Sequence, residues 1–582
     1  MKNQKLENLL NLALDTPPQE RARSSELETG YLLEEQAWEL IVRYSGSLDA
    51  VRAMGIRAVE LRGGYAVMTV PEPLIEAVSA LPQIEYVEMP KRLFFSAGRA
   101  RASSCVNVLQ EEPYFLSGKG VLVAVLDSGI DYYHEAFRTP EGDTRIAALW
   151  DQTLDRVFSR DEINEAVHSG SRETARSLVP SADGSGHGTA VAGIAAGSGR
   201  GGAGSAERGL AYESELLVVK LGHAGPRSFP RTTELMRGVD FAVSRAVERS
   251  RPLAVNISFG NTYGSHDGSS LLETFLDDIG SYGKTVIVTG SGNEGASGGH
   301  ASGQAEPLQP GQPAGSRRSR EIREELSVAP YESSFSVQLW KSYTDTFRVS
   351  LQTPSGELLG PIREELGPVR FSRGDTDILV YYGKPGPYSQ AQEIYFDFVP
   401  EAGGYVETGI WTFVMQPERI VEGRYDLWLP SAGILNTATR FLRPSPDTTL
   451  TIPSTASGVI TVGAYDSTYN SYADFSGRGF TRRTNQVKPD LAAPGVGLTA
   501  PAAGGGYRTV TGTSFAAPVV AGSAALMMQW GIADGNDPFL YGEKVKAYLH
   551  RGAKPLPGIR EYPNPLVGYG ALCLRDSLPL QA

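Results

Sequence analysis

Apolar and polar residues alternate with a period of two in four short segments near the amino terminus, which is typical of half-buried strands. Between these strands, segments 47–54 and 72–81 carry apolar residues at helical spacing, and Gly55 follows the first of them as a stop signal. The strands span residues 38–44, the two halves of 58–70 around Gly63-Gly64, and 84–88. The order β-α-β-β-α-β predicts a ferredoxin-like domain.

From Val121 the pattern changes to continuous apolar runs that alternate with helical segments, as in strands that are buried on both faces. This alternation predicts an α/β fold, a mostly parallel sheet with helices on both faces. The expected strands are 121–126, 215–220, 253–257, 285–289 and, much later, 458–464; the expected helices are 187–196, 233–249, 269–282 and the apolar segment 515–530.

A third pattern interrupts this α/β region. Segment 298–315 is rich in Gly, Pro, Ser and Gln, which is typical of a loop or flexible linker. Short strands of period two follow it, separated by turns with Gly, Pro or Asp, and they predict a β-sandwich. The strands are 332–340, 345–351, 378–382, 392–398, 408–416 and 423–429. Because the α/β pattern resumes near Thr451, the sandwich is an insertion within the α/β domain.

We therefore expect four segments, since a chain of 582 residues is too long for one core. Residues 1–96 form the small first domain, and 97–320 form the first part of the α/β domain. Residues 321–450 form the inserted sandwich, and 451–582 complete the α/β domain. Segment 94–103 is expected to be an extended linker behind the first domain.

Composition narrows the class of protein. A net charge of −12 and an isoelectric point near 5.3 argue against a nucleic-acid partner. Segment 515–530 is too short to span a bilayer and contains Pro518, so no membrane partner is expected. The only cysteines, Cys105 and Cys573, are too few for a disulfide framework; we expect two structural thiols, with a bridge or a reactive thiol as the alternative.

No metal site and no cofactor are expected. The histidines outside the motif described below come with no HExxH or CxxC pattern. The glycine-rich segment 199–204 lacks the lysine of a phosphate-binding loop and is interpreted as an ordinary loop.

The candidate chemistry centres on Ser514, which lies between a Gly512-Thr513 turn and a helix of small residues. A hydroxyl at a helix amino terminus is placed where developing negative charge is favoured. A nucleophilic serine also needs a base and an orienting acid. Asp127 ends an apolar strand, and His187 begins a helix of small residues, so the chain order Asp, His, Ser builds a catalytic triad. Asn293, in a Gly-rich turn after a strand, offers a side-chain amide for an oxyanion hole.

These motifs resemble those of the subtilases, the serine peptidases of the subtilisin family. The matching blocks are Asp127-Ser128-Gly129-Ile130-Asp131, Gly186-His187-Gly188-Thr189, Asn256-Ile257-Ser258-Phe259-Gly260, Gly292-Asn293-Glu294-Gly295, the run from Lys488 to Gly495, and Gly512-Thr513-Ser514. The resemblance covers residues of about 118–300 and 451–535. It implies an endopeptidase in which Ser514 attacks the peptide bond, His187 transfers protons and Asp127 orients His187. Asp131 is expected to be a structural turn residue.

The resemblance also implies the substrate contacts. Segment 256–260 is expected to run as an edge strand along the cleft and to pair with the substrate backbone. Ser258, Phe259 and Gly260 are therefore expected substrate-binding residues, and Leu221 and Gly222 line the opposite side. Whether Phe259 shapes a subsite or packs in the core stays open.

More narrowly, the chain resembles the Csp-type germination proteases of clostridia, also in segments 29–31 and 145–153. That group carries a propeptide of this size and a jelly-roll insertion. The resemblance implies that the first domain is a propeptide that acts as an intramolecular chaperone and binds in the cleft. It implies cleavage of the chain by itself in or just after 93–101, and a protein substrate that is the precursor of a spore cortex hydrolase.

Two alternatives stay open: a general intracellular subtilase, and a regulatory pseudoprotease that acts by binding through the insertion and the propeptide. The segment from Met1 to Leu6 leads to no apolar signal sequence, so we expect a cytoplasmic or spore-associated protein.

One departure from the family concerns calcium. Many subtilases have a His-Pro-Asp segment whose aspartate ligates a stabilising calcium ion. Here the segment is His134-Glu135-Ala136, and an alanine side chain has no oxygen to offer. We therefore expect stability to change little with chelators.

Overall fold

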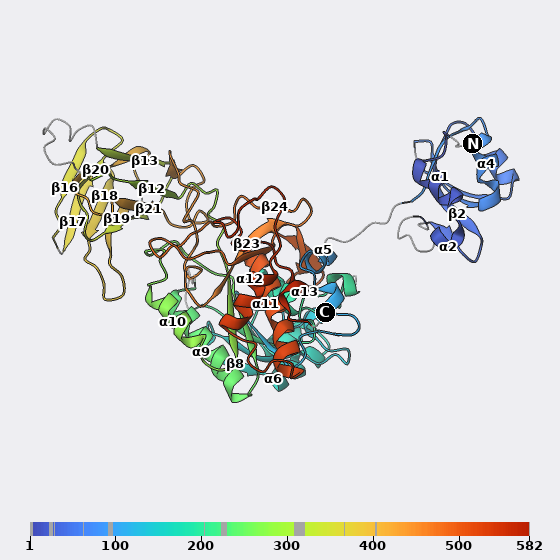
Figure 1. Ribbon diagram of the computed structural model, residues 1–582, viewed down its shortest axis with the longest axis horizontal. Helices are drawn as coiled ribbons and strands as arrows, with labels where there is room; N and C mark the ends of the chain where they lie inside the picture. The colour runs from blue at the N-terminus through green and yellow to red at the C-terminus, as the bar shows by residue number, and fades with distance from the viewer. Residues whose placement is uncertain are drawn as a thin grey trace. The chain divides into compact units, whose positions relative to one another are not determined.

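The computed structural model of the chain consists of two compact units, residues 1–95 and 96–582 (Figure 1). It describes residues 4–21, 27, 30–61, 63–90, 97–202, 204–222, 230–307, 321–365, 367–401 and 404–580. Each unit is described by itself.

The first unit is an antiparallel sheet with the strand order β5-β2-β4-β3, which is the expected ferredoxin-like arrangement. Alternate residues of the central strand β2, Trp38, Leu40 and Val42, are buried and pack with Ile75 and Val78 of a helix. The elements are α1 (Asn8–Asp15), α2 (Pro18–Arg21), β1 (Tyr31–Leu32), β2 (Ala37–Tyr44), α3 (Asp49–Ala53), β3 (Arg57–Leu61), β4 (Tyr65–Pro71), α4 (Ile75–Ala80) and β5 (Ile84–Glu88).

The second unit is built on a nine-stranded sheet of order β24-β23-β11-β10-β6-β9-β7-β8, with β25 beside β23. The inner strands are parallel, and the antiparallel pairings lie at the two ends, β7 with β8 and β23 with β24. The strands are β6 (Leu122–Asp127), β7 (Ile146–Asp151), β8 (Arg156–Ser159), β9 (Glu215–Lys220), β10 (Leu253–Ile257), β11 (Thr285–Gly290), β23 (Ile460–Asp466), β24 (Ser471–Tyr472) and β25 (Leu491–Pro494). The mostly parallel sheet is confirmed, but β7 and β8 were not among the expected strands.

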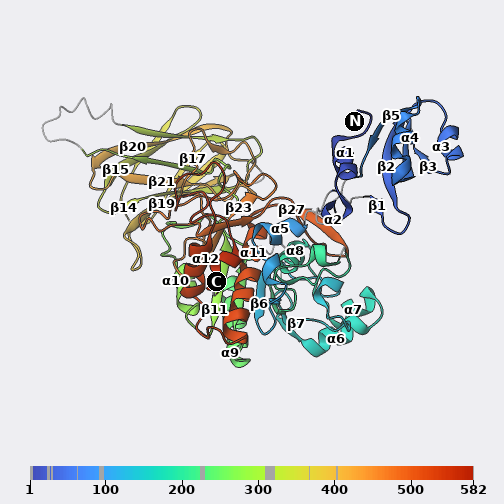
Figure 2. The same ribbon diagram turned by 45° about the vertical axis from the view of Figure 1, so that its right-hand side comes forward.

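Helices cover both faces of this sheet (Figures 1 and 2). On β6, Val123 and Val125 pack in the core that contains α8 and α11, while Leu122 and Ala124 pack in the core that contains α9 and α10. This burial on both faces explains the continuous apolar runs of the sequence. The helices are α8 (His187–Ala196), α9 (Thr232–Glu248), α10 (Leu271–Ile279), α11 (Thr513–Met528), and the peripheral α6 (Arg160–His168), α7 (Arg172–Leu178), α12 (Glu543–Gly552) and α13 (Leu574–Ser577).

Helix α11 is apolar around its whole circumference. Within the described residues, the helical stretch Thr513–Ala533 alone has the length and hydropathy of a membrane span, but 89% of its apolar window is buried inside the unit. The absence of a polar face is therefore explained by burial in the protein core.

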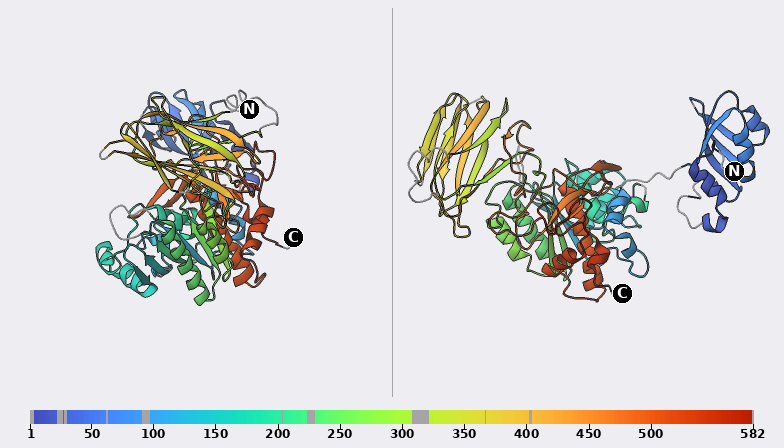
Figure 3. Two further views of the ribbon diagram at one scale, coloured as in Figure 1. Left: turned by 90° about the vertical axis from the view of Figure 1, so that its left-hand side faces the viewer. Right: turned by 45° about the horizontal axis from the view of Figure 1, so that its top comes forward.

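The insertion is a β-sandwich of two antiparallel sheets, gathered in one module (Figure 3). One sheet contains β12 (His300–Gln304), β21 (Arg424–Trp428), β14 (Phe335–Ser342), β19 (Ala391–Pro400), β18 (Thr376–Tyr382) and β17 (Pro368–Arg373); the other contains β16 (Leu358–Ile362), β15 (Thr346–Gln352), β20 (Gly409–Arg419), β13 (Ile322–Val328) and β22 (Arg440–Phe441). Aromatic side chains, among them Phe396, Trp411 and Phe413, fill the space between the sheets.

The sandwich begins earlier than the expected residue 321. Its strand β12 starts at His300, inside the segment expected to be a linker, and pairs with β21. The composition of 298–315 concealed this strand because Gly and Ser are poor strand formers unless a partner supplies the hydrogen bonds. Residues 308–320 lie outside the described residues.

The sandwich is anchored to the α/β domain through buried polar and aromatic side chains. The indole of Trp428 is stacked between His266 at 4.2 Å and His300 at 4.7 Å, measured between ring centroids. The guanidinium of Arg482 donates a hydrogen bond of 2.6 Å to the buried carboxylate of Asp426. Burial lowers the pKa of His266 to about 4, so this ring is neutral at physiological pH.

Two local expectations are wrong. Cys105 and Cys573 are not separate thiols; they form a disulfide, with their Cα atoms 4.9 Å apart. The two ends of the unit lie side by side at this disulfide, where the N–H of Leu574 also donates to the carbonyl of Ser104. The supposed extended linker contains the helix α5 (Ala97–Ser103), whose Ala- and Arg-containing sequence favours a helix, and its residues 94–96 lie outside the described part.

Candidate active site

Three neighbouring parallel strands end at one edge of the sheet, and each delivers a candidate site residue there. β6 ends at Asp127, β10 leads into Ser258, and β11 leads into Asn293. The carboxyl edge of a parallel sheet is where sites of α/β proteins form, because loops there can converge. Helix α11 begins at the same edge, since the carbonyl of Ser514 accepts a hydrogen bond from the Ser258 hydroxyl.

Asp127 and His187 form a close pair. Asp127 is fully buried, and its Oδ1 lies 2.7 Å from Nδ1 of His187. A Cβ on Gly188 would overlap the carbonyl oxygen of Gly129 and lie 3.0 Å from Cβ of Asp127. Only glycine therefore lets the first turn of α8 approach the end of β6 closely enough for this pair.

Opposing influences act on the pKa of His187. Burial of the ring lowers it, but the negative charge of Asp127 and the hydrogen bond that the ring donates to that carboxylate raise it more, so the pKa lies above its ordinary 6.5. The ring also contacts aromatic neighbours, with centroid distances of 5.1 Å to Phe515 and 6.2 Å to Phe259.

A second carboxylate, Asp183, holds the loop that precedes His187. It accepts hydrogen bonds from the N–H and the hydroxyl of Thr189, at 2.8 and 2.7 Å, and from the hydroxyl of Ser128 at 2.8 Å. Burial raises the pKa of Asp183, but these bonds lower it below its usual value, which keeps the carboxylate charged. Asp183 was not predicted as a site residue, because nothing in its sequence neighbourhood distinguishes it from other acidic residues in polar loops.

Asp131 is tied into the same region. Its carboxylate accepts two hydrogen bonds from Arg172, at 2.8 and 2.9 Å, and one from the N–H of Gly504. These contacts fit the expected structural role of Asp131.

Ser514 is the second residue of α11 and is half-buried. Its hydroxyl donates to the carbonyl of Ser258 at 3.3 Å, and between Ser514 and His187, both in the described part of the chain, no hydrogen bond is formed. Catalytic hydrogen bonds are often long in free enzymes and shorten only when substrate binds. Gly512 precedes the helix with φ of 149°, a backbone conformation that favours glycine.

The amide of Asn293 has a defined orientation. Its Oδ1 accepts hydrogen bonds from the N–H of Thr513 at 3.0 Å and from the Thr513 hydroxyl at 3.1 Å. Because an amide nitrogen is only a donor, the atom that accepts from the N–H of Thr513 must be the amide oxygen, and the orientation of the Asn293 side chain is therefore fixed. The Nδ2–H group is then available as a donor beside Ser514.

A cavity of about 200 Å³ lies beside Ser514. Glu294 is the only charged side chain in its lining, and burial raises the pKa of this carboxyl group. The carboxylate accepts a hydrogen bond of 3.2 Å from the N–H of Ala432, which belongs to the insertion. The lining consists of Ser258, Phe259, Gly260, Gly290, Gly292, Asn293, Glu294, Ser431, Thr451, Thr513 and Ser514.

The expected substrate-binding residues fall into two groups. Ser258, Phe259 and Gly260 line this cavity, whereas Leu221 is buried in the core and the N–H of Gly222 donates to Gln152. Asn256 and Ile257 do not lie in an edge strand as expected; they belong to β10, which pairs with β6 and β11 on its two sides. Only the segment after Ile257 leaves the sheet. The binding roles of these residues stay predictions.

The residues around Ala136 do not fit a calcium ion. The guanidinium of Arg145 donates hydrogen bonds of 2.7 and 2.6 Å to the carbonyl oxygens of Ala136 and Ala196, and one of 2.8 Å to that of Ser214. A fixed positive charge thus occupies carbonyl oxygens of the kind that calcium would use. No cluster of three or more His, Cys, Asp or Glu suited to a metal occurs among the described residues.

Comparisons with known proteins place this geometry in a family context. A model of the subtilase family matches residues 118–386 and 436–570, and a model of the Csp protease B prodomain matches residues 4–91. The structure of the Clostridium perfringens CspB protease is similar, with a TM-score of 0.75 and 38% sequence identity; the alignment covers 83% of this chain and 97% of that chain. These findings confirm the expected α/β fold with an amino-terminal prodomain.

The alignments with two more distant relatives cover a smaller share of each relative's length. The minor extracellular protease Vpr of Bacillus subtilis is 24% identical over 484 residues, which are 79% of this chain and 52% of Vpr. The serine protease AprX of the same organism is 32% identical over 186 residues, which are 28% of this chain and 39% of AprX. The chain thus spans about half the length of Vpr.

Chelation should leave the stability of the protein unchanged, because the Arg145 guanidinium, and not a metal ion, binds the carbonyl oxygens around Ala136. We expect excess EDTA to shift the melting temperature of the full-length protein by less than about 1 °C, the shift that a loss of about 1 kcal/mol would cause in a unit of this size. Differential scanning calorimetry measures this, with a calcium-dependent protease as the positive control. A larger drop that added calcium reverses would contradict it.

Proposed function

The chain belongs to the subtilase family, and on that premise we propose that it is a serine endopeptidase that hydrolyses peptide bonds through an acyl-enzyme. The observation that carries the proposal is the 2.7 Å contact between buried Asp127 and Nδ1 of His187 at the sheet edge where Ser514 lies in the first turn of α11. This is the arrangement in which an imidazole serves as the general base for a serine hydroxyl.

The proposed reaction has two halves. Nε2 of His187 takes the proton of the Ser514 hydroxyl as Oγ attacks the peptide carbonyl carbon, and the leaving amine then takes that proton as the C–N bond breaks. A water molecule, activated by His187 in the same way, hydrolyses the ester. Asp127 holds the ring in the required tautomer and stabilises the imidazolium. Nδ2 of Asn293 and the N–H of Ser514 donate to the oxyanion.

We also propose that the first unit is a propeptide that the protease removes. Support comes from the prodomain match to residues 4–91. A protease of this kind binds its substrate as an extended strand. Because Ala97–Ser103 is helical, the scissile bond is expected within the earlier part of segment 93–101, before Ala97. The released unit is then expected to occupy the cleft as an inhibitor.

For the biological substrate, we propose the precursor of a spore cortex hydrolase, cleaved during germination. The similarity to the CspB protease over most of both chains supports this choice. The two other candidates are a general intracellular protease and a pseudoprotease that acts by binding. Incubation with the purified precursor and with casein separates the first two, and labelling of Ser514 by a fluorophosphonate separates both from a pseudoprotease.

Replacing the nucleophile should abolish processing without unfolding the chain. We expect the wild-type protein to yield two chains, split before Ala97, while Ser514→Ala stays one chain with the full mass of about 62.5 kDa. Intact mass spectrometry under denaturing, non-reducing conditions measures this; the Cys105–Cys573 bridge lies outside the released unit and does not retain it. Cleavage of the Ser514→Ala variant at the same bond would refute the assigned nucleophile.

The pH profile should depend on Asp127. Activity requires neutral His187, so kcat/KM falls as pH drops through the pKa of this ring, which lies above 6.5. In Asp127→Asn the charge that raises this pKa is gone; the acid limb should move to lower pH, and the rate should fall by about 10⁴-fold. Peptide hydrolysis between pH 5 and 9 tests this. An unchanged midpoint would show that another group controls the acid limb.

The charge of Glu294 should select the substrate side chain that enters the adjacent cavity. We expect peptides with Lys at the position before the cleaved bond to react faster than those with Glu there. Glu294→Gln keeps an acceptor for Ala432 and should lower the Lys-to-Glu ratio of kcat/KM by about tenfold, roughly one close charge pair. The preference should grow as pH rises and the carboxyl loses its proton. Glu248→Gln, at an exposed position of α9, is the control. An equal Lys-to-Glu ratio in both variants would contradict the selecting role of Glu294.

A further inference from the structure

A second, larger cavity lies at the opposite end of the parallel strands. Lys119 precedes β6, Arg145 precedes β7, Glu215 begins β9 and Arg251 precedes β10, so these residues stand at the amino edge of the sheet, whereas Asp127 ends β6 at the carboxyl edge. The volume is about 630 Å³. The lining, which we call the arginine pocket, comprises Lys119, Gly120, Arg138, Thr139, Pro140, Glu141, Thr144, Arg145, Arg160, Ser198, Arg200, Arg208, Tyr212, Glu213, Glu215 and Arg251.

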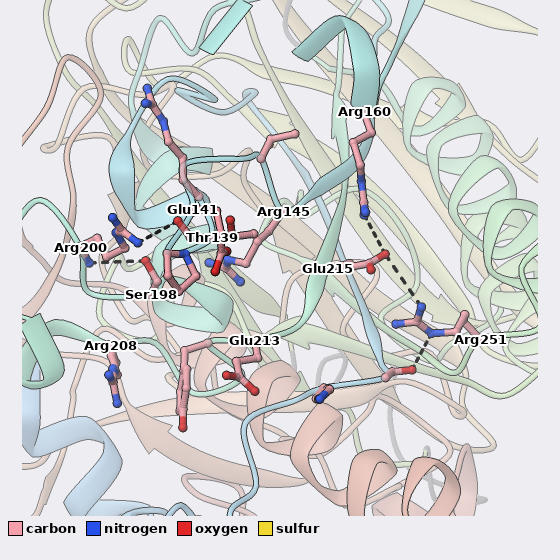
Figure 4. A pocket seen from close by; sticks show the side chains of 16 residues that line it. Thr139, Glu141, Arg145, Arg160, Ser198, Arg200, Arg208, Glu213, Glu215 and Arg251 are labelled. Atoms are coloured by element: carbon pink, nitrogen blue, oxygen red, sulfur yellow. Dashed lines mark hydrogen bonds and ion pairs between the residues drawn. The ribbon is translucent and has the colours of Figure 1, made fainter. Parts of the chain in front are cut away.

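Positive charge dominates this pocket. Seven lysine or arginine side chains and only three glutamates line it, although the whole chain has a net charge of −12. On one side, Arg160 and Arg251 point toward Glu215, and on the other side Arg200 lies beside Thr139 and Glu141, with Arg145 between them (Figure 4).

Most of these cations have no carboxylate within ion-pair distance among the described residues. Glu215 pairs with Arg160 at 2.9 Å and Arg251 at 3.9 Å. The other cations of the pocket form no ion pair with a carboxylate in the described part of the chain. The four arginines among them donate to backbone carbonyls or lie over aromatic rings instead. Arg200 donates to the carbonyl of Thr139, and Arg208 lies 4.7 Å from the ring centre of Tyr212. The cations without such an ion pair are Lys119, Arg138, Arg145, Arg200 and Arg208.

The innermost of these charges is desolvated. Arg145 is 7% exposed, and burial lowers its pKa to about 10, so it still carries its charge at neutral pH. The buried Nε atoms of Arg138 and Arg145 have no hydrogen-bond partner. The negative charge of Glu213 raises the pKa of Arg145 and offsets part of the effect of burial, but the two side chains form no ion pair. A buried charge without a paired carboxylate and a buried N–H without an acceptor both destabilise a protein. An anion in the pocket would relieve both.

We propose that the arginine pocket binds a small organic polyanion that carries carboxylate or phosphate groups. Guanidinium groups recognise both groups with paired hydrogen bonds, and the volume lies within the range of small-molecule sites. Nothing in this inference depends on the proposed proteolysis, because the pocket is at the other edge of the sheet from Ser514.

Titration calorimetry on the full-length Ser514→Ala protein tests the pocket, with pyrophosphate as the phosphate probe and citrate as the carboxylate probe at constant ionic strength. We expect saturable binding of one molecule per chain for at least one probe. Saturable binding of only one of the two probes also supports the proposal, and it shows whether the pocket prefers phosphate or carboxylate groups. Since the protein is inactive by design, the result is independent of whether the wild type is a protease.

Charge variants at exposed rim positions give opposite expectations. Arg200→Gln should weaken binding about tenfold, while Glu141→Gln should tighten it several-fold, in line with the loss or gain of one close charge contact. Arg551→Gln, on an exposed position of α12 outside the pocket, should bind like the parent. Equal melting temperatures without probe show that all variants are folded. Absence of saturable binding for both probes, or equal affinities in all three variants, overturns the proposal.

Discussion

The buried carboxylate of Asp127, paired with His187, is the constraint on which the organisation of the α/β unit depends. A carboxylate that is removed from water needs hydrogen-bond donors. Oδ1 of Asp127 accepts from the N–H of Ser128 and from the ring of His187, each at 2.7 Å, whereas the buried Oδ2 has no hydrogen-bond partner among the described residues. The ring of His187 reaches Asp127 only because Gly188 follows in the first turn of α8, where any side chain would collide with the backbone of Gly129. Close packing of α8 against β6 is therefore required both for the fold of the unit and for the contact between Asp127 and His187.

The same edge of the sheet shows how the neighbouring contacts support this pair. Asp183 ties Ser128, on the loop after Asp127, to Thr189, on the helix that starts with His187. The two members of the pair are thus connected by hydrogen bonds as well as by their own contact. On the other side of Ser514, the N–H of Thr513 orients the amide of Asn293, so the residue before Ser514 determines which way Nδ2 of Asn293 points.

Sequence patterns predicted the parts of the fold that depend on local periodicity. The runs that form β9 and β10 were predicted with their observed bounds, because strands buried on both faces must be apolar throughout. The motifs around Asp127, His187 and Ser514 were found for a related reason, since each needs small or apolar neighbours. Contacts set by three-dimensional proximity alone were missed: the Cys105–Cys573 bridge joins residues 468 positions apart, and Asp183 carries no local signal.

The position of the insertion has a consequence for the cleft. It enters directly after the turn that carries Asn293 and Glu294, and its strand β21 leads through Trp428 to Ala432, whose N–H donates to Glu294. Both ends of the sandwich therefore meet the wall of the cavity beside Ser514. Any tilt of the sandwich would move Ser431 and Ala432 against Glu294. The stacking of Trp428 between two histidines and the Arg482–Asp426 ion pair resist such a tilt, so the anchor that stabilises the insertion also fixes the shape of the cavity.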